Sequence, residues 1–253
     1  MAFLSDYAAI ALVNAICRNV SFGVSNPTLS LHTGDPGETG AQAELSGSGY
    51  ARCSLSATPK TEADEVYAST SASITFASVP ADVLVTHFAA WDGSQMIWSG
   101  ELTDMRGNPA AVRSLTGFGL RVPVSYLTFG FRNALGSFLQ TAVLRALFSA
   151  IAFSVSGRYF SLHSRNPGAH GYHELAGSGY TRQSVSFGLN SGRCCVSTDP
   201  VSVTVPASEI YYWGLWDSVS GGNFLCGGQI DQPVTSEAGD VVLFPTGEIA
   251  VSL

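Results

Sequence analysis

The sequence has few charged residues, and none of its cations form a basic run. Charged residues make up 12% of the 253 positions, hydrophobic residues make up 45%, and the formal net charge is −7. Proteins that bind nucleic acid neutralise phosphates with clustered Lys and Arg, so a nucleic-acid partner is not expected. A surface this poor in charge is typical of chains that bury surface against other subunits.

The sequence also lacks a long apolar run and a matched set of cysteines. No stretch approaches the roughly 18 apolar residues of a membrane-spanning helix, and the first residues lack the positive region of a signal peptide. The five cysteines do not correspond between the two halves of the chain, whereas a disulfide framework would be duplicated with its domain. We therefore expect no membrane contact and reduced thiols in a protein made in a cytoplasm.

Catalytic and metal-binding motifs are absent as well. There is no nucleophile elbow, phosphate loop or dinucleotide fingerprint, and no pair of carboxylates is duplicated. His170 and His173, followed by Cys194 and Cys195, do not have the spacing of a standard zinc site and have no counterparts in the first half. The sequence predicts a protein that is not an enzyme and has no cofactor or metal.

One stretch occurs twice. It reads SLHTGDPGETGAQAELSGSGYAR at 30–52 and SLHSRNPGAHGYHELAGSGYTR at 161–182. Identity at this level indicates an internal duplication, which predicts a first domain at 1–128 and a second at 129–253. In each copy a strand end leads into a turn-rich loop, here called the first motif loop (33–48) and the second motif loop (164–178).

Each half begins with a predicted helix, at 5–19 and 138–148, followed by short alternating segments between Gly and Pro turns. Strands are expected in the first half at 29–31, 50–55, 71–76, 83–91 and 96–102, and in the second half at 159–163, 180–187, 201–205, 210–217, 224–230, 241–244 and 247–253. The polar segment 60–67 is predicted to be a loop, and 117–131 an extended segment that closes the first domain. The fold class is therefore mainly β, with two tandem antiparallel β-sandwich or barrel domains, each preceded by a short N-terminal helix.

Matched polar residues suggest how the motif loops are held. Glu44 precedes Arg52, as Glu174 precedes Arg182, across a Gly-Ser-Gly turn. An ion pair that pins the loop to the next strand is favoured over acid–base catalysis. His32 and His163 end matched strands, and a hydrogen bond to the loop backbone is favoured over a catalytic or metal role.

The loop tips and the tryptophans have alternative interpretations. Asp35 corresponds to Asn166, and either side chain can cap a turn before Pro-Gly; a calcium site at Asp35 and Glu38 would not be shared by the second copy. Trp91 and Trp216 could form a platform for carbohydrate, but they lie in segments that are apolar on both faces, which favours a place in the core.

These motifs resemble a family of tailed-bacteriophage virion proteins described as tail-fibre-like or head-decoration proteins. The resemblance rests on LHTGDPGETG, on the Gly-Tyr-x-Arg that follows, and on Leu215-Trp216-Asp217 and Ala238-Gly-Asp240 in order downstream. It spans nearly the whole chain as two copies of one domain. It implies a structural role in the virion, synthesis in the host bacterial cytoplasm, and no catalytic residues.

We expect a capsid decoration or cement protein that binds between other virion subunits as a homo-oligomer, such as a trimer. The alternatives are a collar, tail or tail-fibre attachment protein, and a module that binds host glycans through exposed tyrosines. The candidate partner contacts in and around the loops are Asp35, Glu38, Tyr50, Arg165, Tyr172 and Tyr180.

Overall fold

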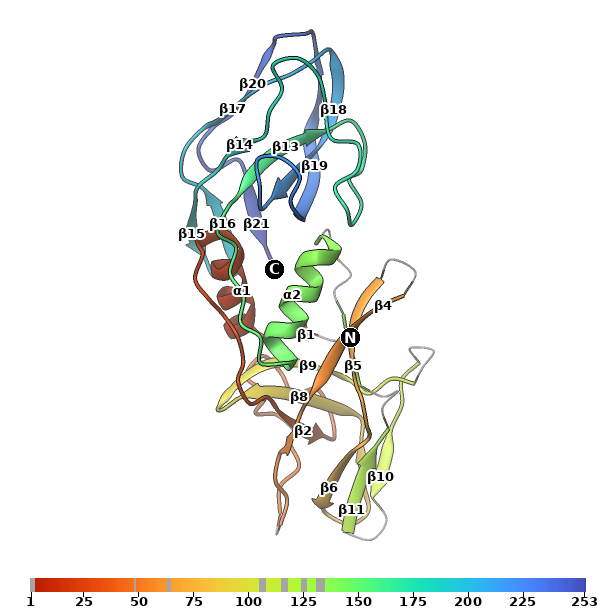
Figure 1. Cartoon of the computed structure of the whole chain (residues 1–253). Helices are drawn as coiled ribbons and strands as arrows, with labels where there is room; N and C mark the ends of the chain where they lie inside the picture. The colour runs from red at the N-terminus through yellow and green to blue at the C-terminus, as the bar shows by residue number, and fades with distance from the viewer. Residues whose placement is uncertain are drawn as a thin grey trace.

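The computed structural model describes residues 3–47, 49–62, 65–104, 108–114, 118–123, 127–130 and 135–253. The chain forms two β-rich lobes, with the two helices between them (Figure 1). The lobe built mainly from the second half of the chain lies at the top of the view, and the lobe built mainly from the first half lies at the bottom. The fold class is the mainly β, antiparallel one that the sequence predicts.

The two helices lie where the apolar spacing predicts them. Helix α1 (Asp6–Arg18) begins at Ser5, whose side chain accepts a hydrogen bond from the backbone N–H of Ala8, and it ends at Asn19 in a left-handed conformation. Helix α2 (Ser137–Phe148) begins at Gly136, which has no side chain to cap it. None of the described helices is long and apolar enough to cross a membrane.

The main sheet of the first repeat has five strands in the order β1-β9-β8-β2-β3. They are β1 (Phe3–Leu4), β9 (Gln95–Glu101), β8 (His87–Asp92), β2 (Thr28–His32) and β3 (Cys53–Ser54). The central strand β8 is buried along most of its length, as expected for a strand that is apolar on both faces. Strand β2 ends at His32, where the first motif loop begins.

Three smaller antiparallel units complete the first repeat, in the orders β12-β5-β4, β11-β6 and β10-β7. Their bounds are β4 (Ala57–Glu62), β5 (Glu65–Thr70), β6 (Ile74–Ser78), β7 (Val83–Val85), β10 (Val112–Ser114), β11 (Phe118–Val122) and β12 (Thr128–Gly130).

The second repeat has the same architecture. Its main sheet has the order β14-β13-β18-β19, and a bridge between Leu135 and Cys226 stands where β1 pairs with β9. The sheet β15-β16-β21 corresponds to β4-β5-β12, and β17-β20 corresponds to β6-β11. The bounds are β13 (Tyr159–His163), β14 (Gln183–Ser184), β15 (Phe187–Ser191), β16 (Cys194–Ser197), β17 (Val201–Thr204), β18 (Ser208–Trp216), β19 (Phe224–Ser236), β20 (Val241–Phe244) and β21 (Ala250–Ser252).

The two helices are shared between the repeats. Helix α1 packs against β9 of its own repeat and against β15, β16 and β21 of the other; helix α2 packs against β19 of its own repeat and against β4, β5 and β12 of the other. Both helices are lined by fully buried aliphatic side chains. The hydrophobic core therefore runs continuously from one lobe to the other.

The crossing between the repeats is reciprocal. Phe22 and Phe153 exchange two backbone hydrogen bonds, of 3.0 and 2.9 Å. The Val24 N–H donates to the Ala146 carbonyl at 2.7 Å, and the equivalent Val155 N–H donates to the Ala15 carbonyl at 2.9 Å. Such paired contacts are the signature of a two-fold, isologous interface, here formed inside a single chain.

The structure corrects several predicted elements. Segment 60–67 is not a loop, because its residues 60–62 lie in β4 and its residues 65–67 lie in β5, and both strands pack against α2 of the other repeat. Segment 83–91 is divided at Thr86 into β7 and β8, and 180–187 contains the short β14 and the start of β15. Segment 117–131 contains β11 and β12, while its positions 117, 124–126 and 131 lie outside the described residues. All five cysteines are free thiols.

Candidate functional site: the motif loops and the depression beside the second

A carboxylate, a guanidinium and an indole are stacked at the base of the first motif loop. Arg52 donates from Nε and Nη2 to the two carboxylate oxygens of Glu44, at 2.9 and 2.8 Å. The carbon at the centre of its guanidinium lies 3.4 Å from the centroid of the Trp91 ring. A bidentate ion pair and a cation–π contact therefore hold one arginine on two sides.

The second motif loop repeats this arrangement with additional bonds. Arg182 donates to Glu174 at 2.8 and 2.7 Å, and its guanidinium carbon lies 3.6 Å from the centroid of the Trp216 ring. Its Nη1 also donates to the carbonyls of Ser218 and Gly221, at 2.9 and 2.7 Å. The Arg182 side chain is 8% exposed, against 29% for Arg52. The second arginine is therefore more deeply enclosed and has more partners.

A chain of hydrogen bonds connects each tryptophan to its motif loop. In the first repeat the Trp91 indole N–H donates to Ser30 Oγ at 2.7 Å, Ser30 Oγ lies 2.7 Å from His32 Nε2, and His32 Nδ1 lies 2.7 Å from the Gln42 carbonyl. When His32 is neutral and carries its proton on Nδ1, each donor in this series of hydrogen bonds has an acceptor and each acceptor has a donor.

The second repeat has the same chain. Trp216 donates to Ser161 Oγ at 3.0 Å, and His163 lies 2.8 Å from Ser161 Oγ and 2.7 Å from the Tyr172 carbonyl. Burial lowers the pKa of both His32 and His163. Both imidazoles are completely shielded from solvent. Burial favours the neutral imidazole, which is the form that these hydrogen bonds require.

Tyr50 and Tyr180 form part of the loop framework rather than its exposed tip. The Tyr50 hydroxyl accepts a hydrogen bond from the Leu31 N–H at 2.9 Å, and the Tyr180 hydroxyl accepts one from the Leu162 N–H at 3.0 Å. The Tyr50 ring also stacks on Phe76, with 6.0 Å between the centroids. Burial raises the pKa of Tyr50 to about 12 and raises that of Tyr180 as well.

Two pairs of matched residues in this framework, one of serines and one of glycines, were not predicted from the sequence. Ser30 and Ser161 are buried, and the hydroxyl of each is hydrogen-bonded both to the tryptophan and to the histidine of its repeat. Gly40 and Gly171 have positive φ, and a Cβ on either would lie 2.4 or 2.3 Å from the tryptophan ring. All four are identical between the copies, so the duplication itself was the available signal. Trp91 and Trp216 are buried, which is the core placement that the sequence favours.

The tips of the two loops have different surroundings. Asp35 and Asn166 both accept from the N–H two residues later at 2.9 Å, which is the turn-capping arrangement that the sequence predicts. Glu38 lies 3.4 Å from Arg193, which reaches across from the second repeat and also contacts Asp6 at 2.5 Å. The first tip is thus engaged within the molecule.

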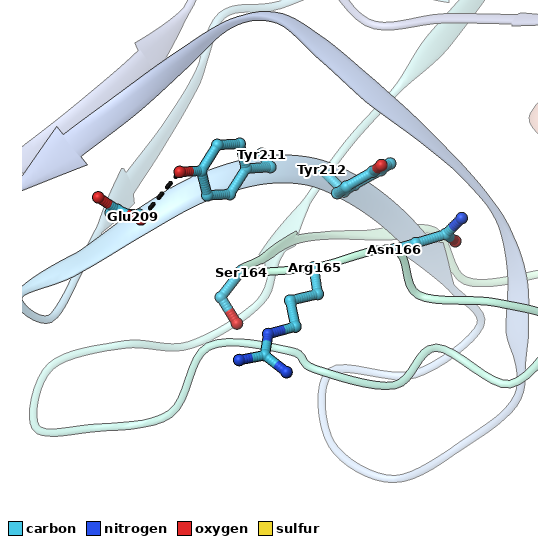
Figure 2. Close-up of a pocket in the computed structure, with 6 residues that line it drawn as sticks. All are labelled: Ser164, Arg165, Asn166, Glu209, Tyr211 and Tyr212. Carbon is cyan, nitrogen blue, oxygen red and sulfur yellow. Dashed lines mark hydrogen bonds between the residues drawn. The ribbon is translucent and has the colours of Figure 1, made fainter.

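The second tip is bonded to the start of α2, where the Ser137 N–H donates to the Ala169 carbonyl at 2.9 Å, and a depression of about 560 Å³ lies beside the loop. Figure 2 shows its two sides: Ser164, Arg165 and Asn166 lie on the loop after β13, and Glu209, Tyr211 and Tyr212 lie along the facing strand β18. The Tyr211 hydroxyl donates to Glu209 at 2.8 Å, and this hydrogen bond is the main reason that the pKa of Tyr211 is raised. Tyr172, further along the loop, is 60% exposed.

The first repeat has different residues at the equivalent positions. The pairing of His32 with His87 matches that of His163 with Tyr212, which aligns β8 with the end of β18. By this register, Gly34 replaces Arg165, Leu84 replaces Glu209, and Thr86 replaces Tyr211. The charged and aromatic lining is therefore specific to the second repeat.

Among the residues that the structure describes, no three His, Cys, Asp or Glu side chains gather as a metal site would require. Asp35 and Glu38 are occupied by the turn and by Arg193.

A family model described as "Podophage GP4 fiber I protein gp80" matches residues 3–110 and again residues 134–252. The two matches follow the internal duplication and together cover most of the chain. Among curated proteins, no match was found.

Proposed function

The chain belongs to this family of phage fibre proteins, and we propose that it is a structural subunit of a tail fibre that assembles with other virion proteins. The observation that carries the proposal is the double match to a fibre-protein family. The family is one of structural phage proteins rather than enzymes, and the protein is a component of a phage virion.

The geometry of the two repeats supports a structural role. Their shared helices and reciprocal backbone bonds join the lobes into one body with a continuous core. In each lobe a bidentate ion pair, partly buried in the first repeat and more deeply enclosed in the second, connects the motif loop to the following segment. We propose that Glu44–Arg52, Glu174–Arg182, His32 and His163 pin the loops so that each has one fixed shape.

The match favours the fibre alternative over capsid decoration. The sequence led us to expect decoration first, with a collar, tail or fibre role as the alternative. The family description names a fibre protein, and no observation on the chain points to binding between capsid subunits. Synthesis in the host bacterial cytoplasm remains part of the proposal.

Labelling the protein on intact particles tests the assignment. Antibodies raised against the purified chain, visualised with gold on phage particles, should decorate the tail region. Label spread evenly over the capsid shell would overturn the fibre assignment in favour of decoration. Particles without any label, although the chain is detected in the infected cell, would overturn a virion role altogether.

We also propose that the chain assembles as a homo-oligomer, and that a trimer would present six similar modules from three chains. Mass photometry or light scattering on the purified protein gives the answer directly. A trimer is expected at three times the 26.5 kDa chain mass. A stable monomer at micromolar concentration would contradict this part of the proposal.

A further inference from the structure

The depression beside the second motif loop is lined by charged, polar and aromatic side chains. Its lining holds two tyrosine rings, one guanidinium, one carboxylate, one amide and one hydroxyl, and no aliphatic side chain. Figure 2 shows the aromatic side chains on the strand side of the depression and the polar groups of the loop on the other, with the exposed Arg165 side chain extending from the loop. An open depression with this lining suits a small hydrophilic ligand. We propose that it binds a saccharide unit that carries a carboxylate.

Arg165 would bind the carboxylate. It is exposed, and no acidic side chain of the described residues forms an ion pair with it. The carboxylate in the lining, Glu209, is instead bonded to the Tyr211 hydroxyl. A guanidinium binds a carboxylate through two parallel hydrogen bonds, so an acidic sugar would supply the charge that the protein does not.

The tyrosines would hold the ring of the sugar. Tyr211 and Tyr212 are half-buried neighbours on β18, so each ring is partly supported by the protein and partly open to the depression. A pyranose has an apolar face of C–H groups that packs against an aromatic ring, while the phenolic hydroxyl remains available at its edge. Aromatic walls therefore favour a sugar acid over a small anion such as phosphate.

Three further side chains can bind sugar hydroxyls. The Glu209 carboxylate accepts hydrogen bonds, and only one of its oxygens is bonded to Tyr211. The Asn166 carbonyl oxygen is bonded to the Gly168 N–H, which leaves the amide NH₂ to donate. The Ser164 hydroxyl lies 3.5 Å from the His173 carbonyl, at the limit of a hydrogen bond, and can turn to a ligand.

The site occurs once in each chain, because the first repeat has Gly34 and His87 where the second has Arg165 and Tyr212. The two copies thus share one scaffold, and the second carries this lining. The inference goes beyond the structural role, and it stands on the depression whether or not the protein is part of a fibre.

The repeats supply the test variants. Arg165→Gly and Tyr212→His each introduce the residue that the first repeat carries at the same place, so both should fold. The probe is an array of uronic and sialic acid oligosaccharides, each beside its neutral counterpart with a hydroxymethyl group in place of the carboxylate. The full chain should retain at least one acidic glycan at least tenfold more strongly than its neutral counterpart, and R165G should abolish this preference.

Y212H should weaken retention of both forms, since it removes a ring wall. Thermal melting of both variants should match that of the parent, which separates loss of binding from loss of fold. The proposal is overturned if no acidic glycan is preferred over its neutral counterpart, or if R165G binds as the parent does. Neither result would affect the labelling experiment on particles, so this inference and the fibre assignment fail independently.

Discussion

The two motif loops share a framework but differ in how tightly it is closed. In both, an arginine lies between a glutamate and a tryptophan, and a serine and a histidine connect that tryptophan to the loop backbone. In the second loop the arginine also binds two carbonyls of the β18–β19 turn and is almost completely buried. The loop beside the depression therefore has the more enclosed base, which would give the proposed saccharide site a rigid support.

The largest expected effect comes from breaking this enclosure. Arg182→Ala should lower the free energy of unfolding by about 3 kcal/mol, because it leaves the Glu174 carboxylate without its cation, with only the Tyr180 hydroxyl at 3.3 Å, and two turn carbonyls without a donor. Arg52→Ala should cost about half as much, because Arg52 is more exposed and makes fewer bonds. Urea denaturation followed by far-UV circular dichroism measures both.

Lysine variants at the same two positions serve as controls, since they keep the charge but not the bidentate geometry. Arg182→Lys should recover only part of the loss. Equal losses for the two alanine variants would show that the additional bonds of the second loop do not stabilise it.

The next effect concerns the junction at which the repeats cross. Gly23 lies against Ala152, and a Cβ there would approach the Ala152 Cα to 2.7 Å. Gly23→Val should therefore cost about 2 kcal/mol, since the overpacked side chain forces the neighbouring Phe22–Phe153 bridge apart. The equivalent residue, Ser154, is exposed, so Ser154→Val should be nearly neutral and is the matched control. Equal losses at the two positions would contradict the close approach.

The sequence predicted the parts of the fold whose causes are local. The cap at Ser5, the turn residues around Pro36 and Pro167, and the strands that lead into the motif loops were found where the residue pattern indicates, whereas the strands predicted after the loops, at 50–55 and 180–187, shrink to the short β3 and β14 with the start of β15. Segment 60–67 was assigned to a loop because its polar face dominates the pattern. Val66 of this segment is buried, and its strand β5 packs against a helix from the other repeat; no local pattern reports such a partner.

The site divides in the same way. Pairing Glu44 with Arg52 required only the repeat, since both residues recur at matched positions. The depression depends on Glu209 and Tyr211, which are distant in sequence from Arg165 and meet it only because β13 pairs with β18. Reading Tyr50 and Tyr180 as surface contacts followed from their position in a loop; the structure shows that their hydroxyls bind strand β2 and strand β13.

The third effect is a pH dependence that both repeats share. The pKa values of His32 and His163 are lowered by burial, so the unfolded chain binds more protons than the folded chain near the ordinary histidine pKa of about 6.5. The free energy of unfolding should therefore be at its full value above about pH 6.5, and it should fall as the pH drops from there toward the lowered pKa values of the two folded histidines. Urea denaturation at a series of pH values measures the slope.

The variants His32→Gln and His163→Gln should each remove part of that slope, because glutamine does not titrate. Hydrogen exchange at the backbone amides of the motif loops should show the same dependence locally. A free energy of unfolding that does not change between about pH 7.5 and pH 5 would contradict the assignment of His32 and His163 as neutral in the folded protein.

The smallest effect separates the two helices. Ser5 caps α1 by accepting from the Ala8 N–H, and its hydroxyl also donates to the Met96 carbonyl; Gly136 begins α2 without a side-chain cap. Ser5→Ala should cost about 1 kcal/mol, measured as a lower urea midpoint. Introducing a cap in the second repeat by Gly136→Ser should not raise the free energy of unfolding, because a Cβ there would lie 2.2 Å from the Phe224 carbonyl oxygen. If Gly136→Ser instead stabilised the protein, the close packing of α2 on β19 would not be what excludes a cap, and the difference between the two helix starts would have no structural cause.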